Sequence, residues 1–165
     1  MDADTINAAY VIAGEASTGV LVLAVILALA GPLCVIGGQV QLQGRAEWRG
    51  AVVSAGGMST TTQANGLYLL RVGPGAHTVV VTMGGYLSAE TTLAVGPGIN
   101  ALPPVRLLAG DLNGDGCVDI ADMEIVSAAY ATTSAQGDVN ADGVVDIADA
   151  ALVAGNYGLC GPIKF

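Results

Sequence analysis

The chain has 165 residues, a formal net charge of −9 and only five Lys plus Arg residues. Because it has no basic patch of the kind that binds DNA or RNA, we predict no nucleic-acid partner. It has one histidine, His77, and no Ser or Cys in a context that indicates activation, so it lacks the residues of a catalytic triad or a zinc site and we predict that it is not an enzyme.

Residues 1–33 form an apolar N-terminal segment. Residues 16–44 contain no charged side chain, and Val20–Ala30 is continuously apolar. Ala28–Ala30 has the small-x-small pattern of a signal-peptide cleavage site, but the residues before it are acidic and include no Lys or Arg, unlike a signal peptide. Three ways of burying the segment remain open: a membrane contact or span, a helix at the centre of a filament, and a strand added to the sheet of a neighbouring copy.

The composition favours assembly with copies of the same chain over a membrane. The segment has no basic anchor, the mean hydropathy is +0.63, and charged residues make up only 12% of the chain. Burying ten large apolar side chains between subunits would contribute on the order of 15–30 kcal/mol before ordering costs. The segment therefore predicts a homopolymer such as a filament.

Residues 34–108 have an all-β pattern. Alternating and β-branched runs predict strands at 39–43, 51–54, 59–63, 67–72, 77–83, 87–95 and 105–108. Asn65-Gly66 marks a hairpin turn, and Gly-Pro-Gly marks a second turn at 73–75. Short strands punctuated by Gly and Pro predict a transthyretin-like or Ig-like β-sandwich rather than a parallel sheet.

The run from Gln63 to Val81, followed by Gly85-Tyr86, resembles the carboxypeptidase regulatory-like family of small β-sandwiches. The resemblance covers most of residues 34–108 and implies a spacer, stalk or adhesion module without catalytic residues. Trp48 and Tyr86 offer a platform on which a sugar ring can stack, so an adhesion or carbohydrate-binding stalk is one alternative function.

Two stretches near the C-terminus, Asp111–Asp122 and Asp138–Asp149, repeat one pattern 27 residues apart. A 12-residue calcium loop supplies oxygen atoms from positions 1, 3, 5, 7, 9 and 12 around a glycine at position 6, here Gly116 or Gly143. The predicted ligands of the first loop are Asp111, Asn113, Asp115, the Cys117 carbonyl, Asp119 and Asp122. Those of the second loop are Asp138, Asn140, Asp142, the Val144 carbonyl, Asp146 and Asp149.

Turn chemistry alone accounts for a single loop of this composition, since Asp, Asn and Gly favour turns. It does not account for two copies with matching ligands and matching valines, Val118 and Val145, at position 8. We therefore predict two bound Ca²⁺ ions, at the weak affinities that suit the millimolar calcium found outside cells.

The repeat continues past each loop, where residues 120–130 align with 147–157. We predict a short helix after each loop, with the aligned apolar pairs on one helical stripe. Those pairs are Ile120 and Ile147, Ile125 and Leu152, Val126 and Val153, and Tyr130 and Tyr157. With both loops and both helices in place, residues 110–161 resemble a dockerin domain. The resemblance implies two Ca²⁺ ions, a pseudo-twofold pair of helices, and docking onto a cohesin domain.

The chain differs from cohesin-binding dockerins at the residues that make the contact. Those dockerins carry hydroxyl residues at loop positions 10 and 11 and basic residues further along the helix. Here the two positions are Ile120-Ala121 and Ile147-Ala148, and no Lys or Arg occurs between Arg106 and Lys164. This difference favours a calcium-set structural unit over a docking module.

The dockerin resemblance also implies a disulfide between Cys117 and Cys160, because the end of the second helix returns beside the first loop in such folds. An oxidising compartment would permit the bond. The alternative is that Cys117 serves only through its carbonyl. The third cysteine, Cys34, would be buried or paired between chains.

We predict a mainly β protein with a small α part. It comprises the apolar segment 1–33, a carboxypeptidase regulatory-like sandwich at 34–108, a dockerin-like two-calcium domain at 109–161 and a tail at 162–165. The predicted function is that of a non-catalytic structural protein, extracellular or at the cell surface, that self-assembles into a filament. The alternatives are a dockerin module that docks onto a cohesin scaffold and an adhesion or carbohydrate-binding stalk.

Overall fold

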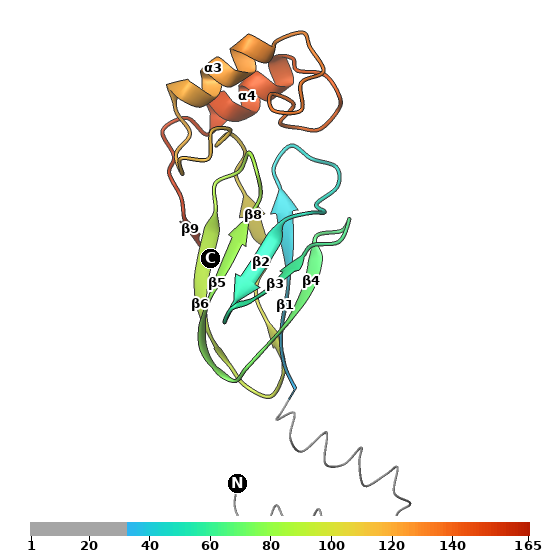
Figure 1. Ribbon diagram of the computed structural model, residues 1–165, viewed down its shortest axis with the longest axis vertical. Helices are drawn as coiled ribbons and strands as arrows, with labels where there is room; N and C mark the ends of the chain where they lie inside the picture. The colour runs from blue at the N-terminus through green and yellow to red at the C-terminus, as the bar shows by residue number, and fades with distance from the viewer. Residues whose placement is uncertain (1–32) are drawn as a thin grey trace, which may run out of the picture. The chain divides into compact units, whose positions relative to one another are not determined.

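The computed structural model describes residues 33–165 of the chain (Figure 1). The expectations for residues 1–32, which concern a signal peptide, a membrane contact or an assembly segment, lie outside the described residues. Within residues 33–165, no helix has the length and apolar character that crossing a membrane requires.

Two β-sheets form the sandwich that the sequence predicts, and a pair of short helices follows it in the chain. One sheet has the order β4-β1-β7, with β8 also paired to β1, and the other has the order β3-β2-β5-β6-β9. The strands are β1 (Cys34–Leu42), β2 (Val52–Ala55), β3 (Met58–Thr61), β4 (Leu67–Val72), β5 (Gly75–Thr82), β6 (Ala89–Val95), β7 (Gly98–Ala101), β8 (Val105–Leu107) and β9 (Ile163–Lys164).

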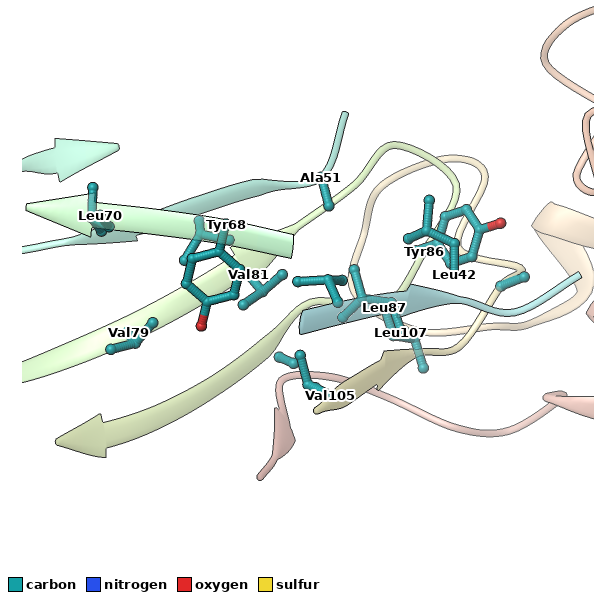
Figure 2. Packing of buried hydrophobic residues seen from close by; sticks show 14 of the residues in the cluster. Leu42, Ala51, Tyr68, Leu70, Val79, Val81, Tyr86, Leu87, Val105 and Leu107 are labelled. Carbon is teal, nitrogen blue, oxygen red and sulfur yellow. The ribbon is translucent and has the colours of Figure 1, made fainter. Parts of the chain in front are cut away.

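Alternation along the strands places every second side chain in the core. In β4, Tyr68, Leu70 and Val72 are buried, whereas Leu67 and Leu69 are exposed. Strands β1, β2, β5 and β8 contribute further buried aliphatic residues, which pack in one cluster between the sheets (Figure 2). Each fully buried Val, Leu or Ile side chain contributes about 1.5–3 kcal/mol relative to exposure.

The pairing of β1 differs from a simple antiparallel pattern. This strand begins at Cys34 rather than at Gln39, and it pairs antiparallel with β4 but parallel with β7 and β8. Strand β7 was not predicted because its residues do not alternate between buried and exposed. Besides its pairing with β1, it is fixed by Asn100, whose Nδ2 donates to the carbonyls of Val35 and Gly96 at 3.3 and 2.9 Å.

The turn at Asn65-Gly66 forms, but it does not close a hairpin. It joins β3 to β4, and these strands belong to different sheets, so the predicted hairpin is wrong although the turn is correctly located. The first hairpin is made by β2 and β3, around the glycine pair Gly56-Gly57.

Two helices, α3 (Ile120–Ala129) and α4 (Ile147–Gly155), begin directly after the two predicted calcium loops. The predicted single apolar stripe is wrong. Val126 and Val153 are buried, but Ile120 and Ile147 are 60% and 70% exposed. Six residues of helix rotate a side chain by about 240°, which moves Ile120 and Ile147 away from the buried face.

The last residues of the chain return to the sandwich. Strand β9 pairs parallel with β6, the Ile163 amide donates to the Ser88 carbonyl at 2.8 Å, and the Lys164 ammonium forms an ion pair with Glu90. The sequence predicted only a tail at this point, since two residues are too few to show a strand pattern.

Substituting Gly66 tests the turn between the sheets. Gly66 has φ of +75°, and an added Cβ would lie 2.0 Å from the Val40 carbonyl oxygen. Gly57 has φ of +77° but open space around its Cβ position. Both alanine variants carry backbone strain, but we expect Gly66→Ala to lower the free energy of unfolding by about 1–3 kcal/mol more than Gly57→Ala. Urea denaturation measures the difference, and equal losses would contradict the close packing.

Candidate metal centre

Each predicted calcium loop is closed by the fully buried aspartate at its position 12. Asp122 Oδ1 accepts hydrogen bonds from the amides of Leu112 and Asn113 at 2.7 and 3.1 Å, and its Oδ2 accepts one from the Asp119 amide at 2.8 Å. Asp149 makes the equivalent bonds to Val139, Asn140 and Asp146 at 2.8, 3.1 and 2.9 Å. Three N–H donors offset the removal of each carboxylate from water.

The aspartates at loop position 9 start the helices. Asp119 is the N-cap of α3 and Asp146 that of α4, and their side chains accept from the amides of Ala121 and Ala148 at 2.8 and 2.7 Å. Because the position-12 carboxylate bonds back to the N-cap amide, each loop ends in a capping box. The loop and the first turn of its helix are therefore one hydrogen-bonded unit.

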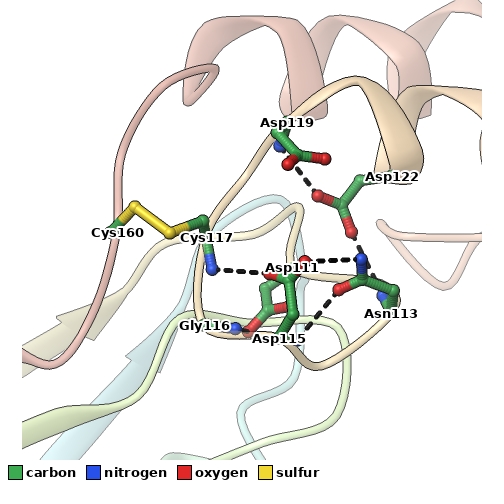
Figure 3. The surroundings of a disulfide bond; sticks show 8 residues. All are labelled: Asp111, Asn113, Asp115, Gly116, Cys117, Asp119, Asp122 and Cys160. Atoms are coloured by element: carbon green, nitrogen blue, oxygen red, sulfur yellow. Dashed lines mark hydrogen bonds between the residues drawn. A yellow bond between two sulfur atoms is a disulfide. The ribbon is translucent and has the colours of Figure 1, made fainter.

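Positions 3 and 5 are oriented by short bonds within each loop. In the first loop, Asn113 Oδ1 accepts from the Asp115 amide and Asp115 Oδ1 from the Cys117 amide, both at 2.9 Å (Figure 3). In the second loop, Asn140 and Asp142 accept the equivalent bonds at 2.8 and 3.0 Å. The two loops thus hold matching side chains in matching ways.

Asp111, at position 1 of the first loop, has an unsatisfied oxygen. Its side chain is nearly buried, its Oδ2 accepts from the Gly116 amide at 3.2 Å, and its buried Oδ1 accepts no hydrogen bond. Burial raises the pKa of Asp111, and the negative charges of Asp122 and Asp115 raise it further against the opposing effect of the Gly114 and Gly116 amides. A bound cation would satisfy this oxygen, so the residues present fit a calcium ion.

Within residues 33–165, no three His, Cys, Asp or Glu side chains form a metal-binding cluster by themselves. Each predicted ligand set contains four aspartates. In this structure their carboxylates accept hydrogen bonds from backbone amides of the loop and do not converge on one point.

The two loop-helix units are joined by reciprocal backbone bonds. The Val118 amide donates to the Leu159 carbonyl, and the Gly158 amide donates to the Val118 carbonyl, each at 2.8 Å, just after α4. In the same way, the Val145 amide donates to the Thr132 carbonyl at 2.8 Å and the Ala131 amide donates to the Val145 carbonyl at 2.9 Å, just after α3. A disulfide joins Cys117 to Cys160 beside the first of these pairings (Figure 3). The position-8 valines therefore join each loop to the end of the other unit.

The junction between the sandwich and the loops uses residues that the sequence did not reveal. Buried Asn156 donates through Nδ2 to Gln43 Oε1 and the Ala109 carbonyl, at 2.7 and 2.6 Å. Arg45 Nε donates to the carbonyl of Val139, a residue 94 positions away, at 3.3 Å. No local pattern indicates contacts across such a distance along the chain.

The predicted sugar platform is wrong. Tyr86 is only 4% exposed, and its hydroxyl donates to the Gln43 carbonyl at 2.9 Å, so its ring face is not available to a glycan. Trp48 is half-buried, and its indole N–H donates to the Arg45 carbonyl at 3.2 Å. Both aromatic residues pack within the protein.

Comparison with known protein families matches residues 109–156 to the dockerin type I domain. These residues form a dockerin domain, preceded by a β-sandwich. Dockerin type I domains bind calcium, in agreement with the loops described above. The carboxypeptidase regulatory-like assignment of the sandwich stays a prediction.

Two solved structures resemble the sandwich and dockerin together. They are an N-terminal and a C-terminal interface mutant of a type II cohesin–X–dockerin complex from Acetivibrio cellulolyticus. Their TM-scores are 0.68 and 0.67, at 23% and 24% sequence identity, and each match covers 76% of this chain and 96% of the other. No curated protein matches the chain. These likenesses show a shared fold. A homopolymer filament, which the sequence predicts, is not shown by any of the comparisons.

The disulfide should stabilise the dockerin. It closes a stretch with a sequence separation of 43 residues, and removing it should lower the free energy of unfolding by about 2–4 kcal/mol. We expect Cys160→Ser to lower the unfolding temperature measured by calorimetry, and reductant to lower that of the wild type to a similar value. Reductant should leave the Cys160→Ser variant unchanged. A wild-type protein insensitive to reductant would contradict a stabilising role.

Proposed function

We propose that this protein is a non-catalytic, calcium-dependent docking module that binds a cohesin-type domain outside the cell. The observation that carries the proposal is that the dockerin match at residues 109–156 coincides with two loops whose position-12 aspartates accept the same three backbone hydrogen bonds. The fold shared with cohesin–X–dockerin complexes supports a cohesin-type partner. The disulfide between Cys117 and Cys160 supports an oxidising, extracellular location.

Each loop would hold one Ca²⁺ ion through the predicted ligands at its positions 1, 3, 5, 7, 9 and 12. Calcium supplies positive charge that offsets the clustered carboxylates of a loop. The chain supplies the arrangement: the position-12 aspartate ties positions 2, 3 and 9 together, and the capping box carries that geometry into α3 or α4.

The docking face would include the exposed apolar residues of the helical pair. Ile120 and Ile147 occupy equivalent places at loop position 10, and Tyr130 and Tyr157 follow the two helices with 53% and 55% exposure. Because the dockerin has no Lys or Arg between Arg106 and Lys164, contact with the partner would rely on apolar burial rather than on basic side chains. Its affinity should therefore depend only weakly on salt.

Calcium titration tests the metal sites. Isothermal calorimetry should detect two bound ions per chain, and Asp111→Asn or Asp138→Asn should each abolish one of them, since each removes the position-1 carboxylate of one loop. Glu124→Gln is the matched control, because it removes one exposed charge from α3 outside the loops. No calcium binding by the wild type, or an equal effect of the control, would contradict the assignment.

Binding to a panel of cohesin domains tests the docking function. Biolayer interferometry should show binding in calcium that is lost with EDTA. The double variant Ile120→Asp/Ile147→Asp should weaken it at least about tenfold, since it places two charges in an apolar contact. Leu69→Asp, at an apolar residue of the sandwich that is 66% exposed, is the control. Absence of binding to every cohesin, or binding that the double variant leaves unchanged, would refute the proposal.

A further inference from the structure

The two calcium loops are alike internally but have different supports. The first is held by the disulfide between Cys117 and Cys160. The repeat of 27 residues places Val144 and Thr133 at the equivalent positions of the second unit, where no disulfide can form. The second loop must therefore be held in another way.

The sandwich places two polar groups against the second loop. Arg45 Nε donates to the Val139 carbonyl at 3.3 Å, and the Tyr86 hydroxyl, which has a single proton to donate, lies 3.4 Å from the same oxygen. The Arg45 guanidinium lies over the Tyr86 ring, 5.5 Å from its centre, and the same hydroxyl donates to the Gln43 carbonyl at 2.9 Å. Val139 is 3% exposed, so both contacts lie in a largely desolvated place where hydrogen bonds are strong.

Val139 connects these donors to the ligand positions. It is residue 2 of the loop, between Asp138 and Asn140, and its amide donates to Asp149 Oδ1 at 2.8 Å. The sandwich therefore holds the carbonyl of a residue whose amide holds the position-12 carboxylate. Displacing Val139 would displace positions 1, 3 and 12 together.

The first loop lacks this contact. Leu112 occupies the equivalent position, and its amide donates to Asp122 Oδ1 at 2.7 Å. In the part of the chain that the structure describes, no side chain donates to the Leu112 carbonyl. The Arg45–Tyr86 contact is therefore specific to the second loop.

We propose that Arg45, seated on Tyr86, is a positioning residue that prepares the second loop to bind calcium. Groups bonded directly to metal ligands typically contribute about 10- to 100-fold to metal affinity. Arg45 acts one residue further out, through Val139, whose amide holds the predicted ligand Asp149, so its contribution should lie at the lower end of that range. Calcium binding and the sandwich are then coupled at this loop, whereas the first loop depends on its disulfide. The inference rests on the proposed function, because it requires calcium in the second loop.

Calcium titrations of paired variants test the proposal in the full-length protein. Asp111→Asn leaves the second site to be measured alone, and Asp138→Asn leaves the first. Arg45→Gln should weaken the second site about tenfold. Tyr86→Phe should weaken the same site by a smaller factor, because the hydroxyl proton goes mainly to the Gln43 carbonyl. Both variants should leave the first site within about twofold of its original affinity.

Arg49→Gln is the matched control for the loss of charge. Arg49 lines the same surface groove as Arg45, beside Asn140 and Asp142, but its Nε pairs with Glu47 at 2.8 Å. Removing a cation near a calcium site on its own favours the ion, so this control should not weaken binding. Weakening by Arg49→Gln equal to that by Arg45→Gln would overturn the proposal, as would an equal effect of Arg45→Gln on both sites.

A second readout is amide hydrogen exchange in calcium. Exchange at Val139 should be faster in Arg45→Gln and Tyr86→Phe than in the wild type, whereas exchange at Leu112 should not change. If the Arg45 variant does not fold, Tyr86→Phe decides, since it removes only a hydroxyl. A wild type that binds no calcium would overturn the proposed function and this inference together, whereas two normal sites unaffected by either variant would overturn this inference alone.

Discussion

The structure of the dockerin depends on two carboxylates that are removed from water. Asp122 and Asp149 are fully buried, and each is satisfied by three backbone amides drawn from both ends of its loop. A buried charge without such partners would be strongly destabilising. The hydrogen bonds to each buried carboxylate close its loop and fix the first turn of the helix that follows. The positions of the metal ligands and the start of the helix therefore cannot change independently.

The sandwich and the dockerin pack as one compact unit, Cys34–Phe165. Gly44 is central to their contact, because its φ is +83° and a Cβ there would lie 2.5 Å from Leu152 Cδ1 on α4. After α4 the chain returns to the sandwich as β9, so both ends of the dockerin are attached to it. The proposed docking face would thus be presented on a unit held at both ends, and such preorganisation favours affinity.

The sequence predicted the features that are encoded locally. The spacing of Asp, Asn and Gly located both loops and the starts of both helices, and alternation located most of the strands. Features that join distant residues were missed: the parallel pairing of β1, the strands β7 and β9, and the contact between Arg45 and Val139. Such pairings depend on tertiary packing, and no single segment carries a signal for them.

The function predicted from the sequence follows mainly from composition. The apolar N-terminal segment and the low fraction of charged residues predict a filament, and helical spacing predicts a buried stripe that includes Ile120 and Ile147. In the structure these two isoleucines are exposed at equivalent places of the repeat. An aliphatic residue at loop position 10 is therefore compatible with the proposed docking face, to which it would contribute apolar area.

Diffraction from crystals grown in calcium tests the central claim most directly. The account predicts two anomalous peaks, one in each loop, each surrounded by oxygen atoms at about 2.3–2.6 Å, with Asp111 Oδ1 among the ligands of the first. Loops that keep the hydrogen bonds described here and show no anomalous peak in millimolar calcium would contradict the claim that both loops bind calcium.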